Sequence, residues 1–375
     1  MTVDLTKFGA NNPKPKKFLR PVTVFRLALF CIALSIIISV ATRKPAPETE
    51  AGASSPQPAA ISSEQASSTE TPDASPQLDQ ANSKLSNLRR LVESAKQSSA
   101  FYLEGAKNGD PEALFNLAVL YDFGEGDVEV DKNKAISLYE QAAAKDYPPA
   151  IFSLAASYDF SDGVAEDKVK ATELYQQAAE LGFAKAQFNL GYNYENGEGI
   201  EPDEQKALYW YQKASDQGEE MAQLKMALIY DNGYFGISED NSKAVEYYQK
   251  AADQGLALAQ YNLAISYDSG EGIDEDKAKA FEWYLKAAEQ GVDKAQYNIA
   301  VSYDTGDGVE KDLVKAVQWY QKAAEQGLDV AQYNLAISYL YGEGVKKDKS
   351  LAIQWFTKAA AQGHKQAQDV LRTLK

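Results

Sequence analysis

The chain has 375 residues, of which 45% are hydrophobic, with one cysteine and a net charge of −16. This length and apolar content allow a sizeable buried core, and a single cysteine excludes a scaffold held by disulfides. Residues 1–44 carry a net charge of +7, and residues 45–375 carry −23. Because so acidic a body repels phosphate groups, nucleic acid is excluded as a partner, and membrane contact is limited to the N-terminal region.

An apolar segment near the N-terminus predicts a single transmembrane helix. Sixteen uncharged residues, 27–42, follow a basic cytoplasmic tail at 1–21. A spanning helix needs about 20 apolar residues, so we place it at 22–42, with the Arg26 side chain reaching the interface. The basic tail predicts a cytoplasmic N-terminus and an exported remainder. The alternative is a signal peptide cleaved after Ala41, which would exceed the usual length of about 15–30 residues.

The composition changes after this segment. Residues 43–83 are mainly Pro, Ser, Ala, Thr and Glu, which predicts a disordered linker because such a segment cannot form a core. Residues 84–108 predict an N-terminal capping helix for the folded part. The chain has no Asn-x-Ser/Thr sequon. This favours the periplasmic face of a bacterial inner membrane over the lumen of the endoplasmic reticulum.

The remaining chain repeats one pair, a Gly followed four residues later by an Ala, at steps of 36 or 37 residues. This period predicts stacked helical hairpins, since one hairpin cannot bury its apolar face alone. We therefore predict an all-α, right-handed superhelix of seven repeats at 109–362, closed by a C-terminal capping helix at 363–375. The anchors are Gly109/Ala113, Gly182/Ala186, Gly218/Ala222, Gly255/Ala259, Gly291/Ala295, Gly327/Ala331 and Gly363/Ala367, with Asp146/Ala150 replacing the Gly once.

Each repeat divides into a first helix, here helix A, and a second, helix B. In helix A, Ala259, Leu263 and Tyr267 are spaced by four and predict a packing stripe. A turn that is usually Gly-x-Gly ends helix A. An Asp opens every helix B and predicts an N-terminal cap: Asp131, Asp167, Asp203, Asp240, Asp276, Asp312 and Asp348.

One stretch of the chain resembles the Sel-1-like repeat, a relative of the tetratricopeptide repeat. The resemblance rests on residues 259–264 (Ala-Gln-Tyr-Asn-Leu-Ala), Tyr267, the turn Gly270-Glu271-Gly272 and the helix B residues 279–284. The resemblance covers about residues 100–370. It implies an adaptor or scaffold, as in bacterial envelopes and the endoplasmic reticulum. A cysteine-rich branch of that family carries a disulfide in each repeat. The repeats here have no cysteine, which separates this chain from that branch.

Two rows on helix A are candidate partner-binding residues, since the matching positions line the concave groove in tetratricopeptide relatives. A peptide bearing Lys or Arg would suit aromatic rings beside carboxylates. The alternative is that the aromatics pad adjacent repeats and the acids are solvated helix ends. The candidates are Phe115, Phe152, Phe188, Tyr261, Tyr297, Tyr333, Asp268 and Asp304.

The fourth repeat departs most from the pattern. Its turn is one residue longer than most and contains two adjacent aromatics, Tyr234 and Phe235. Exposed aromatics are common interface anchors, so this loop is a second candidate binding site. A recurring Asn, exemplified by Asn262, follows the aromatic row on helix A and is assigned to hydrogen bonds between repeats or to a peptide backbone.

Catalytic residues are not identified. The only His is His364, and the only Cys, Cys31, lies in the apolar N-terminal segment, so nucleophilic triads and zinc sites have no basis. No cofactor and no metal are expected. The sequence predicts a membrane-anchored, non-catalytic scaffold for cell-envelope assembly or regulation. The alternative is an envelope protein that binds or processes glycan or peptidoglycan through its aromatics and carboxylates.

Overall fold

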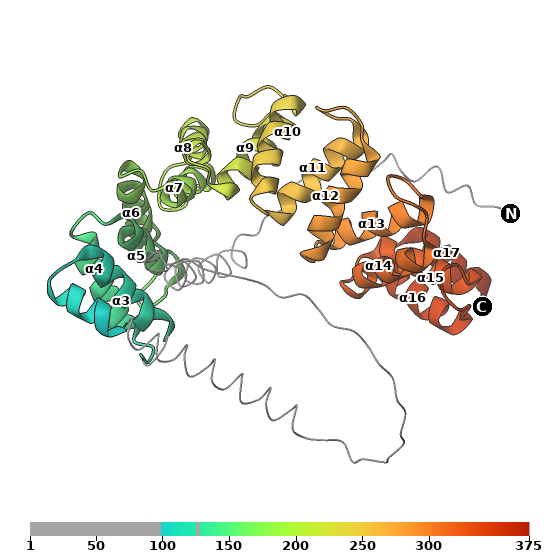
Figure 1. Ribbon diagram of the computed structural model, residues 1–375, viewed down its shortest axis with the longest axis horizontal. Helices are drawn as coiled ribbons and strands as arrows, with labels where there is room; N and C mark the ends of the chain where they lie inside the picture. The colour runs from blue at the N-terminus through green and yellow to red at the C-terminus, as the bar shows by residue number, and fades with distance from the viewer. Residues whose placement is uncertain (1–98, 125–127, 375) are drawn as a thin grey trace, which may run out of the picture. The chain divides into compact units, whose positions relative to one another are not determined.

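The computed structural model describes residues 99–124 and 128–374, and this part of the chain is all-helical, without a strand (Figure 1). Residues 99–107 are helical, and fifteen further helices follow. They are α3 (Pro111–Phe123), α4 (Lys132–Ala143), α5 (Pro148–Phe160), α6 (Lys168–Glu180), α7 (Ala184–Asn196), α8 (Glu204–Asp216), α9 (Glu220–Asn232), α10 (Asn241–Asp253), α11 (Ala257–Ser269), α12 (Lys277–Glu289), α13 (Asp293–Thr305), α14 (Leu313–Glu325), α15 (Asp329–Tyr341), α16 (Lys349–Ala361) and α17 (Lys365–Leu374).

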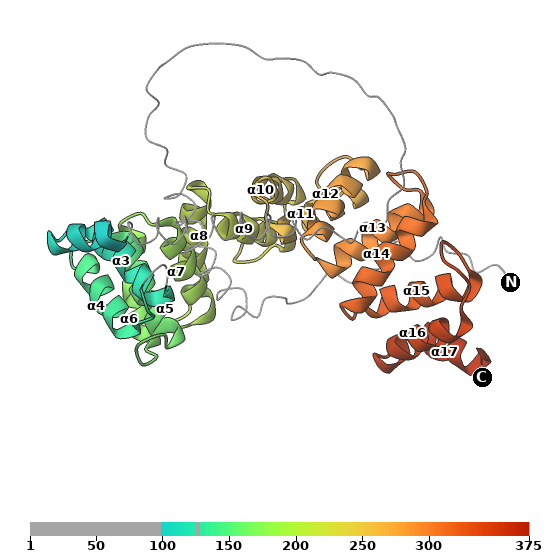
Figure 2. The same cartoon turned by 60° about the horizontal axis from the view of Figure 1, so that its bottom comes forward.

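Consecutive helices pair as hairpins. In every repeat a helix A (α3, α5, α7, α9, α11, α13 or α15) packs against the helix B that follows it, and each helix B packs against the next helix A. Both views show this succession in chain order (Figure 2). The last helix, α17, packs on α16 and occupies the place of an eighth helix A. The predicted all-α solenoid of helical hairpins is confirmed.

The Asp residues that open helix B are caps, as predicted. The Asp276 carboxylate accepts a hydrogen bond from the backbone N–H of Lys279 at 3.0 Å, and the same bond recurs in the other six helices B. Each satisfies an N–H that the first turn leaves without a partner. These carboxylates are therefore occupied by helix termini.

The core continues from repeat to repeat. The predicted stripe is buried, with Ala259 and Leu263 inaccessible to solvent and Tyr267 nearly so. Small alanines on helix B, such as Ala287 and Ala288, are also buried where neighbouring helices approach. The stacking of hairpins thus buries a face that one hairpin alone would leave in water.

The predicted basic tail, transmembrane helix, linker and most of the N-terminal capping helix lie outside the described residues. Among residues 99–124 and 128–374, no helix is both long and apolar enough to cross a membrane.

Candidate functional site

Each aromatic of the predicted groove row lies against an aromatic of helix B in its own repeat. The ring centroids are 5.6–5.9 Å apart in all six pairs: Phe115–Tyr139, Phe152–Tyr175, Phe188–Tyr211, Tyr261–Tyr284, Tyr297–Tyr320 and Tyr333–Phe356. Phe115 and Phe152 are only 5% and 4% exposed, and each contacts a second ring. Those two rings serve packing. The other four are half-buried.

The acidic row at the end of helix A accepts hydrogen bonds from the same helix B tyrosines. The Tyr211 hydroxyl donates to Glu195 at 2.6 Å, and Tyr320 donates to Asp304 at 3.3 Å. Equivalent pairs are Tyr139–Asp122, Tyr175–Asp159, Tyr248–Asp231 and Tyr284–Asp268. Burial, and then the neighbouring carboxylate, raise the pKa of these tyrosines. They therefore stay neutral donors.

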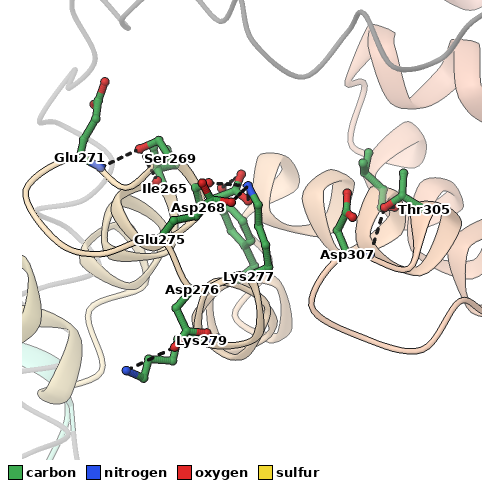
Figure 3. Close-up of polar contacts among 12 residues, drawn as sticks. Ile265, Asp268, Ser269, Glu271, Glu275, Asp276, Lys277, Lys279, Thr305 and Asp307 are labelled. Atoms are coloured by element: carbon green, nitrogen blue, oxygen red, sulfur yellow. Dashed lines mark hydrogen bonds and ion pairs between the residues drawn. The ribbon is translucent and has the colours of Figure 1, made fainter.

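Asp268 has a second partner within its own repeat. Its carboxylate lies 3.0 Å from the Lys277 ammonium at the start of helix B, which also contacts Glu275 at 3.3 Å (Figure 3). The charge of Asp268 is thus partly balanced internally, while the side chain remains partly exposed.

A third side chain, from the next repeat, completes each of these clusters. Asn262 lies beside the Tyr248 hydroxyl and lowers its pKa, and Asn298 and Asn334 do the same for Tyr284 and Tyr320. Asn189 has the same effect on Tyr175, although its buried Nδ2 has no hydrogen-bond partner. In the fourth repeat Lys225 occupies the position of this Asn, and its ammonium pairs with the Glu195 carboxylate at 2.7 Å. We call each set of tyrosine, acid and third residue a polar junction.

The last junction contains none of these polar groups. Leu340 replaces the acid, Phe356 the tyrosine and Val370 the third residue, and all three lie in one hydrophobic cluster. All three members differ together at this junction. The recurring Asn thereby belongs to contacts between repeats, one of the two roles assigned to it.

A second polar network links the repeats through glutamines, which the sequence analysis missed. The Gln290 amide donates to the Gly255 carbonyl and to Gln260 in the same repeat, at 2.9 and 2.8 Å. Gln260 in turn donates to the Ala252 carbonyl of the preceding repeat at 3.2 Å. The same bonds recur at the later junctions. The recurrence of glutamine pairs 30 residues apart in the sequence is the pattern from which these hydrogen bonds could have been predicted.

A cavity of about 350 Å³ lies at the junction of the third and fourth repeats. It is lined by Gln205, Leu208, Tyr209, Gln212, Lys213, Asp216, Met226, Tyr230 and Ile237. The predicted loop site adjoins it, because the Gln205 amide donates to the Phe235 carbonyl at 3.0 Å. The side chain of Tyr234 in this loop is 50% exposed.

The other chemical candidates are structural. His364 stacks on Tyr333, with centroids 4.7 Å apart, and its Nδ1 accepts from the backbone N–H of Ala367 at the start of α17. Within the described ranges, no group of three His, Cys, Asp or Glu side chains is arranged to hold a metal ion.

Comparison with known proteins identifies the repeat. The Sel1 repeat family model matches residues 111–147, 148–183, 184–219, 220–256, 257–292, 293–328 and 329–364. The crystal structure of c5321, a protective antigen of uropathogenic Escherichia coli with an SLR fold, is 31% identical with a TM-score of 0.69; the match covers 74% of this chain and 59% of the antigen.

A Sel1 repeat protein from Oxalobacter formigenes is 28% identical, with a TM-score of 0.53 and coverage of 70% and 96%. The chain thus spans less than two thirds of the antigen but nearly all of the Oxalobacter protein. No curated protein matches it. The seven consecutive family matches show that this chain belongs to the Sel1 repeat family.

Proposed function

We propose that this protein is a non-catalytic scaffold that binds a protein partner along the helix A face of its C-terminal repeats. The main observation behind this proposal is a row of half-buried side chains repeated at 36-residue intervals. Tyr261 and Ile265, one turn apart on α11, recur as Tyr297 and Val301 on α13. The third set is Tyr333 and Ile337 on α15. Partly exposed aromatic and aliphatic side chains are typical interface anchors.

The acids beside this row set the expected charge of the partner. Asp268 and Asp304 are partly exposed, and residues 45–375 carry a net charge of −23. A segment bearing Lys or Arg is therefore attracted over a distance and can place its cations over the tyrosine rings. Sel1 repeats generally mediate contacts between proteins, which supports a scaffold over an enzyme.

Site-specific photo-crosslinking in living cells tests the face. A photoreactive residue replaces Ile265, Val301 or Ile337 on helix A, and matched controls carry it at the exposed helix B positions Glu282 and Gln318. We expect one protein adduct from the helix A positions and none from the controls. Equal adducts from both sets, or none from helix A, would contradict the proposal.

The affinity of the captured partner then tests individual anchors. Tyr261→Ala and Tyr297→Ala should each weaken binding by more than about 1 kcal/mol, because central aromatics dominate interfaces. Asp276→Ala is the control, since it removes a helix B cap and lowers the melting temperature without touching the groove. If the groove variants bind normally while changes at Tyr234 and Phe235 abolish binding, the loop is the site instead.

We further propose that the apolar segment at 22–42 anchors the protein in a bacterial inner membrane, with the repeats in the periplasm and a role in envelope assembly or regulation. The support is the sequence alone: a basic tail, then sixteen uncharged residues, then an acidic chain.

A further inference from the structure

The fourth repeat concentrates its departures from the pattern at its junction with the third. Glu219 is buried at the start of α9, where Leu256, Val292 and Leu328 stand in the following repeats. Departures from an otherwise uniform repeat weaken local consistency and therefore mark sites of function or strain. Departures on the neighbouring helix α8 lie at the same junction.

On α8 the departure is an exposed aromatic. Tyr209 is 52% exposed, and the equivalent helix B position is Glu246, Glu282 and Gln318 in the next three repeats. Its ring lies under the Lys213 ammonium, 5.5 Å from the centroid, and contacts the ring of Trp210 at 5.0 Å. A large apolar side chain thus stands in water where the other repeats place a polar one.

The extra residue of the α9–α10 turn separates this turn from α8. In regular repeats the turn touches the preceding helix B, so that a Cβ on Gly308 would lie 2.1 Å from the Lys277 carbonyl oxygen. At Gly236 the nearest such atom is Nε2 of Gln205, at 3.8 Å. Phe235 adopts a left-handed φ of +57°, a conformation that costs a non-glycine residue about 1 kcal/mol or more. The strained insertion accompanies the cavity between α8, α9 and the turn.

The cavity has the chemistry of a side-chain receptor. Leu208 and Ile237 supply apolar surface, and Tyr209 and Tyr230 supply ring surfaces. Met226 also borders the cavity, although it is only 1% exposed. A volume of about 350 Å³ is large enough for one bulky apolar side chain. Lys213, Asp216 and two glutamines provide the polar part of the lining.

The flanks of the cavity are acidic. The segments 201–216 and 237–253, which include α8, most of the α9–α10 turn and α10, contain eight acidic residues and four lysines, while the charged residues in the lining itself are Lys213 and Asp216. A partner segment with cations on either side of its apolar anchor is therefore complementary to this surface.

We propose that this cavity binds a bulky apolar side chain, such as Trp, of a protein segment whose flanking residues are Lys or Arg. The site is separate from the helix A rows and rests on the proposed function only in that its occupant is a protein.

The methionines of the chain allow a direct test. The chain has three, of which Met226 lines the cavity and Met221 lies on the same helix outside the lining. Full-length protein labelled with [13C-methyl]methionine, in detergent micelles, is titrated with a peptide of one central Trp flanked by lysines. We expect a saturable ring-current shift of the Met226 methyl signal, with Met221 unchanged.

Two control peptides separate the apolar and charged contributions. Replacing Trp by Ala should abolish the Met226 shift, and replacing the lysines by Glu should weaken binding by about tenfold or more. A Met226 signal that does not move at about 1 mM peptide, or a Met221 signal that moves equally, would overturn the proposal.

Variants assign the response to the cavity. Deleting Phe235 restores the regular turn length and should abolish the shift, while Glu271→Ala in the regular turn of the next repeat should leave it intact. Tyr209→Gln places the residue of the sixth repeat, Gln318, at an exposed position without adding charge, and should weaken binding about tenfold even if the deletion variant does not fold. Unchanged binding in Tyr209→Gln would refute the site. The crosslinking at Ile265 reports on the helix A face independently, so either proposal can fail alone.

Discussion

The helix B tyrosines illustrate how single hydroxyl groups connect the repeats. Each donates to the acid that ends its own helix A and lies beside a polar side chain of the next repeat, as Tyr320 does between Asp304 and Asn334. A buried hydroxyl that loses its acceptor costs about 1–3 kcal/mol, whereas replacing all partners by apolar groups can be nearly neutral. The wholly apolar last junction is the natural example of the second case.

We expect Asp304→Leu to lower the free energy of unfolding by about 1–2 kcal/mol, because the Tyr320 hydroxyl then lacks its acceptor. Adding Tyr320→Phe and Asn334→Val reproduces the last junction and should recover most of that loss. Urea denaturation of the single and triple variants measures both. Additive losses in the triple variant would show that the three residues are not coupled.

Glu219 is a buried residue whose contribution to the free energy of unfolding depends on pH. Its carboxylate accepts from the Ala222 N–H at 2.6 Å, yet burial raises its pKa from 4.5 to about 7. The folded state therefore holds the proton more tightly than the unfolded state does. The stability that the folded chain gains by holding this proton is fully present below about pH 4.5 and is lost as the pH rises through about 7.

We expect Glu219→Gln to remove this dependence while its amide oxygen still accepts from Ala222. The free energy of unfolding of the variant, relative to wild type, should rise by roughly 3 kcal/mol between about pH 4 and pH 8. Urea melts at several pH values measure it, with the exposed Glu282→Gln as control. Parallel curves for wild type and Glu219→Gln would contradict the assignment.

At the scale of the element, glycines of two kinds end the helices. Gly291, after helix B, has a φ of +92° and open space within 4 Å of the point where a Cβ would lie. Gly308, in the turn after helix A, has a positive φ, and a Cβ at this position would clash with the Lys277 carbonyl oxygen. The first requires glycine for its backbone conformation alone. The second also requires it for the contact between repeats.

We expect Gly291→Ala to cost about 1–2 kcal/mol through its left-handed backbone. Gly308→Ala should cost roughly 1–3 kcal/mol more, because its Cβ also displaces the neighbouring repeat. Urea midpoints of the two variants test the difference. Equal losses would mean that the turn moves aside without cost.

At the scale of the whole molecule, the acidic repeats act together as a long-range field. Partly exposed charges influence how fast a cationic partner arrives more than how tightly it finally binds. Asp268 also retains Lys277 as an internal partner, which further limits its contribution to affinity.

We therefore expect Asp268→Asn with Asp304→Asn mainly to slow association and to flatten its dependence on salt. Stopped-flow or surface-binding kinetics with the crosslinked partner, at several ionic strengths, measure this. A change confined to the dissociation rate would show direct contact instead.

The proposed anchor also predicts a topology. Reporter enzymes fused after residue 60 should be active only outside the cytoplasm, and the protein should remain with membranes after a carbonate wash. Release of a soluble species trimmed near Ala41 would favour the cleaved signal peptide.

The all-helical solenoid, the seven repeats, the caps on helix B and the buried stripe of helix A follow from the amino-acid sequence alone. These features depend on local signals that recur every 36 or 37 residues, so that capping Asp276 and packing Leu263 are readable from neighbours a few positions away. The helix A rows were also visible, but partner binding by Tyr261, Tyr297 and Tyr333 stays a prediction.

The contacts of those rows became visible in the folded chain. Tyr284 reaches Asp268 across 16 residues through the pairing of helices within a repeat, and Lys225 reaches Glu195 of the preceding repeat across 30 through the stacking of repeats. No local pattern specifies either contact. The cavity beside Tyr209 likewise arises because one inserted residue changes how a turn meets the preceding helix. Contacts between repeats depend on the geometry of stacking, which is set by the packed helices together and by no single segment.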